Sequence, residues 1–213
     1  MNQAIYRYSA HVAAMAMKTF VGLIGFVLIT ASGLASADTL DFSRNAGEND
    51  LAFAARVLQF STDADPHTIA TTWNGISTLF VDYTTTDNYP ERPLVALQQQ
   101  PNGRYRAIRV TLGEQEGGTP DIVAIGFARA SRSPTKDLVV ILAWTQRHYD
   151  FGGTLYEVRI FDTPKPDQTA LTLLKISEHF GSECDCGWRD GTTKHFRFKT
   201  IAAVKTELKR LGY

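Results

Sequence analysis

Residues 138–146 read LVVILAWTQ, and this stretch decides the fold class. Its first six residues are continuously apolar and rich in branched side chains. Such a run is typical of a strand that is buried on both of its faces. We therefore predict that residues 138–143 form the central strand of a β-sheet.

Further strand-like segments lie on both sides of this stretch. They are rich in β-branched and aromatic residues, and several alternate between apolar and polar positions, as Ile108 and Val110 do with Arg109 between them. Turn signals such as Gly152-Gly153 separate them. Short strands with turns between them predict an antiparallel sheet. The segments are residues 77–83, 94–98, 105–112, 121–129, 138–146 and 154–161.

A helical pattern stands at each end of this β-rich region. Residues 50–60 (DLAFAARVLQF) carry apolar side chains at helical spacing, and either Asn49 or Asp50 is suited to cap their start. Residues 200–211 form a second amphipathic segment with Thr200 as its expected N-cap.

The predicted fold class is accordingly α+β, with an antiparallel β-meander sheet flanked by an N-terminal and a C-terminal helix. A small β-barrel or a sandwich is the alternative. We also expect a strand at residues 171–176. Asp190-Gly191 is a two-residue hairpin signal, and we expect a strand after it at residues 195–199. Residues 38–49 are polar, and we expect them to form a mobile arm.

The first 37 residues have the pattern of a cleavable signal peptide. Lys18 precedes an apolar run of 11 residues (20–30, FVGLIGFVLIT), and Ala35-Ser36-Ala37 fits the A-x-A cleavage rule. An uncleaved membrane anchor is the alternative, but a spanning helix needs about 20 apolar residues. We expect a mature chain that begins near Asp38, forms a single domain over residues 38–213 and is periplasmic or secreted.

The charge balance excludes some classes of partner. The whole chain has 22 basic and 22 acidic residues. The signal segment carries Arg7 and Lys18 and no acidic residue, so the mature chain has 20 basic and 22 acidic residues. A nucleic-acid partner requires a basic surface, and we expect none. No stretch after residue 37 is long and apolar enough to span a membrane.

The only two cysteines stand in the sequence Cys184-Asp185-Cys186. Export to an oxidising compartment favours a disulfide between them. Such a bond is either a structural staple or, because its ring is small, redox-active. Metal binding is the third interpretation, with His179 and His195 as the nearest imidazoles. We predict the disulfide, with no metal site and no cofactor.

Residues 147–153 (RHYDFGG) are the second candidate site. On an extended segment His148 and Asp150 share a face, so they are able to form a general base with its orienting carboxylate. The alternative is that Gly152-Gly153 makes a hairpin turn while the polar side chains satisfy local backbone groups. We predict a binding surface formed by His148, Tyr149 and Asp150 together with Trp188.

The expected function is that of an exported, soluble, non-enzymatic protein that binds another protein in the cell envelope, for example an inhibitor or an immunity protein. The absence of a catalytic motif from the sequence favours this class over an enzyme. Two alternatives stay open. One is an envelope hydrolase that uses His148 and Asp150, and the other is a thiol- or metal-handling protein that uses Cys184 and Cys186.

Overall fold

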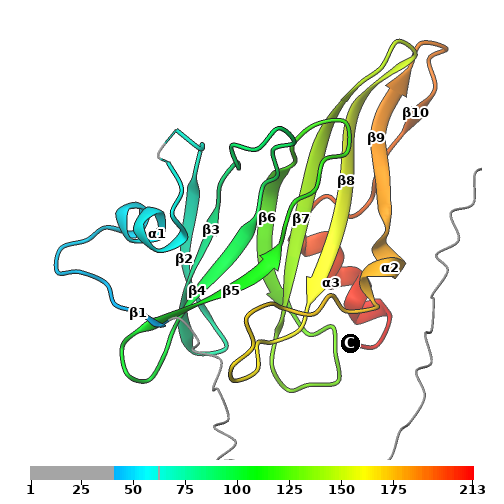
Figure 1. Cartoon of the computed structure of the whole chain (residues 1–213). Coiled ribbons are helices and arrows are strands. Elements are labelled where there is room, and N and C mark those ends of the chain that lie inside the picture. The colour runs from blue at the N-terminus through cyan, green and yellow to red at the C-terminus, as the bar shows by residue number, and fades with distance from the viewer. Residues whose placement is uncertain (1–40, 62) are drawn as a thin grey trace, which may run out of the picture. The chain divides into compact units, whose positions relative to one another are not determined.

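The computed structural model describes residues 41–61 and 63–213, and the structural statements below concern these residues. The signal peptide predicted for residues 1–37 lies outside them. The described chain is mostly β, with ten strands and three helices (Figure 1).

The first sheet has five antiparallel strands in the order β1-β5-β4-β3-β2. Apart from the short β1, consecutive strands are neighbours, so the sheet is a simple meander. Its strands are β1 (Asp41–Phe42), β2 (His67–Trp73), β3 (Ile76–Asp82), β4 (Leu94–Gln99) and β5 (Tyr105–Thr111).

The second sheet also has five antiparallel strands, in the order β10-β9-β8-β7-β6. Its two longest strands, β7 and β8, have 11 residues each. The strands are β6 (Asp121–Ala128), β7 (Asp137–Arg147), β8 (Phe151–Phe161), β9 (Ser182–Trp188) and β10 (Thr193–Lys194).

The prediction of a β-rich chain with helices is confirmed at that level, but the prediction of one continuous sheet is wrong. The strands divide into two sheets, and those that the structure describes form no closed barrel. Side chains of both sheets meet in one core cluster, in which Phe80 and Ile108 of the first sheet join Leu138, Val140 and Leu142 of the second. The apolar run of β7 has a second sheet on one side, which its sequence did not reveal.

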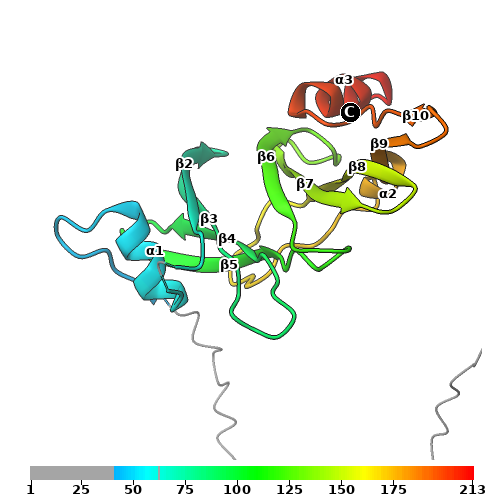
Figure 2. The ribbon, with the colours of Figure 1, turned by 90° about the horizontal axis from the view of Figure 1, so that it is seen from above.

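Helices cover the faces of the sheets that point away from this shared core. Helix α1 (Asp50–Leu58) buries Phe53 and Val57 against the first sheet, in a cluster with Leu79 and Val95. Helix α3 (Ile201–Arg210) buries Val204 and Leu208 against the second sheet, and the short α2 (Ser177–Phe180) adds Phe180 to the same cluster. Figure 2 shows α1 beside the first sheet and α3 beside the second.

Both predicted helix caps are confirmed. The Asn49 side chain accepts a hydrogen bond from the Ala52 N–H at 2.8 Å. The Thr200 hydroxyl accepts one from the Ala203 N–H at 3.2 Å. These bonds satisfy N–H groups in the first turn that have no partner within the helix.

Turns and loops also join the two sheets. The Trp73 indole N–H donates to the Lys136 carbonyl at 2.7 Å, and the Asn74 side chain bonds both the N–H and the carbonyl of Lys136. The Arg159 guanidinium of β8 donates to the Thr111 hydroxyl of β5. The relative position of the sheets is therefore set by directed hydrogen bonds as well as by apolar packing.

Three local predictions are wrong. Residues 171–176 and 195–199 are not strands, and only isolated bridges occur at Ala170 and Leu173. The arm expected at residues 38–49 includes β1, and it is tied to α1 by an ion pair of 2.7 Å between Glu48 and Arg56. These segments are held by contacts with distant parts of the chain, which the local pattern does not contain.

Candidate functional site

The ends of two hairpins meet at one extremity of the second sheet. Strands β7 and β8 are joined by residues 148–150, and β9 and β10 by residues 189–192. Phe151 pairs with Trp188 across β8 and β9, and the Arg189 N–H donates to the Asp150 carbonyl at 3.0 Å. Figure 1 shows both hairpin ends at the top of the view, beyond the strand ends of the first sheet.

Five side chains gather here, and we name them the aromatic tip: His148, Tyr149, Phe151, Trp188 and Arg189. The rings of His148 and Phe151 are stacked with centroids 5.1 Å apart, and those of Phe151 and Trp188 are 5.9 Å apart. Together with their neighbours they line a shallow, open depression of about 370 Å³. The structure therefore brings together the residues proposed from sequence, although they are about 40 positions apart in the chain.

Tyr149 is the most exposed ring of the aromatic tip, at 78%. The Arg189 guanidinium lies 4.3 Å from the centroid of this ring, within the range of a cation–π interaction. Sequence reasoning missed Arg189. Its only signal was its position directly after Trp188 at the start of a turn.

His148 and Asp150 do not form the base–orienter pair that a hydrolase needs. The Asp150 N–H donates to His148 Nδ1 at 3.2 Å, so this nitrogen serves as an acceptor. A carboxylate orients a histidine by accepting a hydrogen bond from a ring N–H, and the Asp150 carboxylate is 3.8 Å from the same nitrogen. Around the depression, the only hydroxyl group belongs to Tyr149. This geometry is that of a hairpin turn closed by its own side chain.

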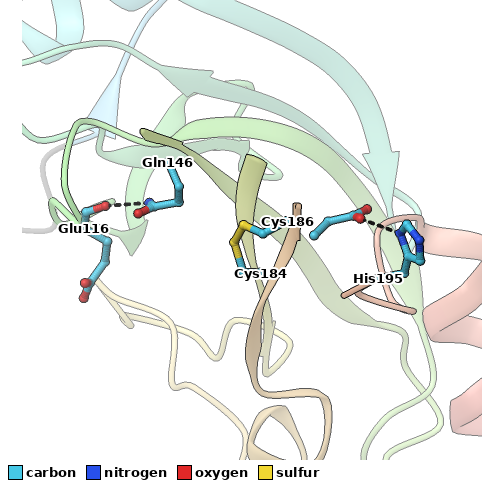
Figure 3. Close-up of a disulfide and its surroundings, with 6 residues drawn as sticks. Glu116, Gln146, Cys184, Cys186 and His195 are labelled. Carbon is cyan, nitrogen blue, oxygen red and sulfur yellow. Dashed lines mark hydrogen bonds and ion pairs between the residues drawn. A yellow bond between two sulfur atoms is a disulfide. The ribbon is translucent and has the colours of Figure 1, made fainter. Parts of the chain in front are cut away.

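The two cysteines form a disulfide within β9, directly behind the aromatic tip (Figure 3). Their Cα atoms are 5.3 Å apart, and Cys186 is buried. Cys184 pairs with Leu155 and Cys186 with Gly153 of β8, so the bond lies within a paired strand. The disulfide stiffens the strand that carries Trp188.

Asp185 stands between the two cysteines, and its carboxylate contacts residues of the segment before α3. It accepts a hydrogen bond from His195 at 2.9 Å, which Figure 3 draws as a dashed line ending at His195. It also makes an ion pair with Lys199. The Lys199 ammonium, and after it the His195 imidazole, lowers the pKa of the Asp185 carboxyl below its usual range. His195 therefore holds the segment before α3 against β9.

His179, the other imidazole considered for a metal site, is also engaged. Its Nε2 lies 2.8 Å from Glu207 Oε1 in α3. Over the residues with described positions, no group of three or more His, Cys, Asp or Glu side chains is arranged to hold a metal ion. His179 and His195 therefore do not join the two cysteines in a set of metal ligands.

A second polar cluster, which the sequence did not suggest, surrounds Arg92. This guanidinium has 4% side-chain exposure and donates to Asp82 at 2.6 Å, to Asp65 at 3.2 Å and to His67 Nδ1 at 2.6 Å. Bonds to Thr84 and to the Asp65 carbonyl use its other N–H groups. Because its donors are satisfied within the chain, Arg92 has a structural role in joining three segments.

Among the residues seen in the structure, no helix is long and apolar enough to cross a membrane. A scan of protein-family models and searches of curated proteins and of solved structures found no match to this chain.

Proposed function

We propose that this protein acts by binding another protein through the aromatic tip. The observation that carries the proposal is the meeting of Tyr149, Trp188 and Arg189 on two adjoining hairpin ends. Tyrosine, tryptophan and arginine are the residue types most enriched among the energetically dominant positions of protein interfaces. Trp188 is held by its pairing with Phe151, and Tyr149 and Arg189 stand on the short turns next to that pair. Residues that are ordered before binding lose less conformational entropy when they bind.

The support of the tip is rigid at several levels. The Phe151–Trp188 pair ends the ladder between β8 and β9, and Cys186 of the disulfide stands two residues before Trp188 in β9. Tyr149 stands out from this support with Arg189 against its ring. Such an arrangement presents apolar area and a cation together, which suits a partner surface with an apolar pocket beside an acidic group.

The proposed place of action is the periplasm or the cell exterior. The sequence of residues 1–37 supports export, and an inhibitor or immunity protein of the envelope is the kind of binder we propose. Cleavage after Ala37 is tested by the intact mass of protein purified from cells that express the whole chain. A mass equal to that of residues 38–213 is expected, and retention of the N-terminal segment would contradict export with cleavage.

Site-specific photo-crosslinking tests the binding surface. A photoreactive amino acid replaces Tyr149 in the full chain, which is expressed in its source cell. We expect one discrete crosslinked protein, identified by mass spectrometry, and loss of that product when Trp188→Ala or Arg189→Ala is added. Tyr89 supplies the matched control, because its ring is equally exposed, at 80%, but lies on the loop between β3 and β4.

The outcomes separate clearly. A product at position 149 that is absent at position 89 supports a protein partner for the aromatic tip. No product at position 149, or the same products at both positions, from protein shown by circular dichroism to be folded, contradicts the proposal.

A further inference from the structure

Strand β2 is the outermost strand of the first sheet, and its outer edge is open. Its seven residues pair with β3 on one side only, from His67 opposite Asp82 to Trp73 opposite Ile76. Within residues 41–61 and 63–213, no segment other than β3 makes a backbone hydrogen bond with residues 67–73. Every second residue of β2 therefore presents an N–H and a carbonyl group without a partner in the described structure. Figure 2 shows the ribbon of β2 at the end of the first sheet.

The sequence of β2, HTIATTW, contains none of the devices that normally protect a sheet edge. Natural edges are blunted by charged side chains, proline, bulges or very short strands. Residues 68–73 carry no charge and no proline, and the register with β3 is unbroken. Ile69 is 44% exposed, and Ala70 and Thr72 are exposed as well.

The other edge strands, β1, β10 and β6, each have a feature that opposes pairing with a further strand. Strands β1 and β10 have two residues each, which is too short to template a long pairing. Strand β6 has an irregular register between Ile122 and Ala124, and Ile201 of α3 packs so closely on Gly126 that a Cβ there would lie 2.6 Å from it. Among the strands of the described residues, β2 therefore has the longest regular edge without a strand partner.

We propose that β2 pairs antiparallel with β2 of a second copy of this chain, about a two-fold axis at Ala70. With Ala70 opposite its own counterpart, Ile69 lies opposite Thr71 and Thr68 opposite Thr72. Threonine–threonine pairs such as Thr68 with Thr72 are favourable across strands, and no charges oppose each other over residues 68–73. The two five-stranded sheets join into one continuous sheet.

A second copy fits this edge better than an unrelated extended peptide. A two-fold contact uses the same patch on both molecules, so one pairing closes both open edges and leaves none for further growth. The strand is also nearly self-complementary about its centre, as such a contact requires. The interface lies on the first sheet and does not use the aromatic tip, so its failure would leave the proposed function untouched.

Sedimentation equilibrium of protein purified from cells that express the full chain tests the dimer. We expect a reversible monomer–dimer equilibrium. Ala70→Lys and Ala70→Glu each place like charges opposite one another, which costs about 1 kcal/mol and raises the dissociation constant about fivefold. An equimolar mixture of the two variants pairs opposite charges and is expected to dimerise again.

Ser77→Lys is the matched control. Ser77 is exposed on β3 of the same hairpin, one strand away from the edge, and this variant should dimerise like the unaltered protein. A monomer at every concentration reached would overturn the proposal. A dimer that Ala70→Lys leaves unchanged, or one that the mixture of variants does not restore, would overturn the assignment to β2.

Discussion

Gly153 of β8 lies directly opposite Cys186 of β9, and no other residue fits in its place. A Cβ at position 153 would lie 2.2 Å from the Asp185 carbonyl oxygen and 2.8 Å from Cys186 Sγ. The Gly153 φ of +154° is also one that side-chain-bearing residues rarely adopt. The disulfide strand approaches β8 because this glycine leaves room for it.

Gly153→Ala is therefore expected to destabilise the protein by about 1–3 kcal/mol, since the new methyl group has to displace backbone. Urea denaturation measures the change in the free energy of unfolding. Gly152→Ala is the control, because a Cβ there meets only the Gln146 carbonyl oxygen, at 3.8 Å. Equal losses in the two variants would contradict the close approach as the cause.

The disulfide itself should contribute modestly to stability. A bond between Cys184 and Cys186 closes a loop of very few residues, and loop-closure entropy then gives about 1–2 kcal/mol. We expect Cys184→Ser with Cys186→Ser to lower the free energy of unfolding by this amount. Thiol titration of the unaltered protein in denaturant, without reductant, is expected to find no free thiol. Detection of two thiols would contradict the bond.

Local sequence patterns correctly predicted the buried strand β7 and the N-caps of helices α1 and α3. The apolar run at Leu138 is the fully buried centre of β7, and the caps at Asn49 and Thr200 form as expected. In each case the deciding interaction lies within a few residues, or the burial is so complete that composition reveals it.

The elements that were missed depend on long-range contacts. Strand β2 is exposed at four of its seven positions, with exposed residues on both faces, and HTIATTW shows no alternation of apolar and polar residues. Strand β9 (SECDCGW) contains few residues that favour strands, and it forms because β8 offers it an edge. The division into two sheets has the same origin, since the partner of each β7 face is set only by tertiary packing.

The candidate site shows the same limit. His148, Tyr149, Asp150 and Trp188 were proposed together from loop position and chemistry, and the register of β8 with β9 places them side by side. That register is not visible in either segment alone. Arg189 was missed for this reason, because its role beside Tyr149 exists only once the hairpin ends meet.

Glu207 should make the protein sensitive to acid. This buried carboxyl in α3 bonds to Arg210 and His179 and pairs with Arg197 at 3.0 Å. Its hydrogen bonds, first with Arg210 and then with His179, lower its pKa from 4.5 to about 2. A carboxyl with a lowered pKa in the folded state stabilises the fold above its unfolded pKa. That stabilisation is lost as the pH falls from 4.5 towards 2.

Glu207→Gln is expected to flatten the dependence of the melting temperature on pH over this interval and to lower the melting temperature near neutral pH. Thermal scans at a series of pH values measure both effects. Glu178→Gln is the control on the neighbouring α2, because Glu178 is exposed. A pH profile of Glu207→Gln parallel to that of the unaltered protein would show that Glu207 does not carry the acid sensitivity.

Removing Arg92 alone should lower the free energy of unfolding more than replacing both Arg92 and Asp82 by apolar residues. Both side chains are about 95% buried and 2.6 Å apart. Arg92→Leu therefore removes the guanidinium from the Asp82 carboxylate and leaves only the His67 imidazole beside it, at 3.2 Å. Removing one member of a buried pair typically costs about 3–5 kcal/mol, whereas replacing both by apolar residues costs much less. We therefore expect Arg92→Leu to unfold at much lower urea than Arg92→Leu combined with Asp82→Leu. Similar stability of the two variants would mean that the loss of the guanidinium's bonds to Asp65 and Thr84, common to both, dominates over the unpaired charge.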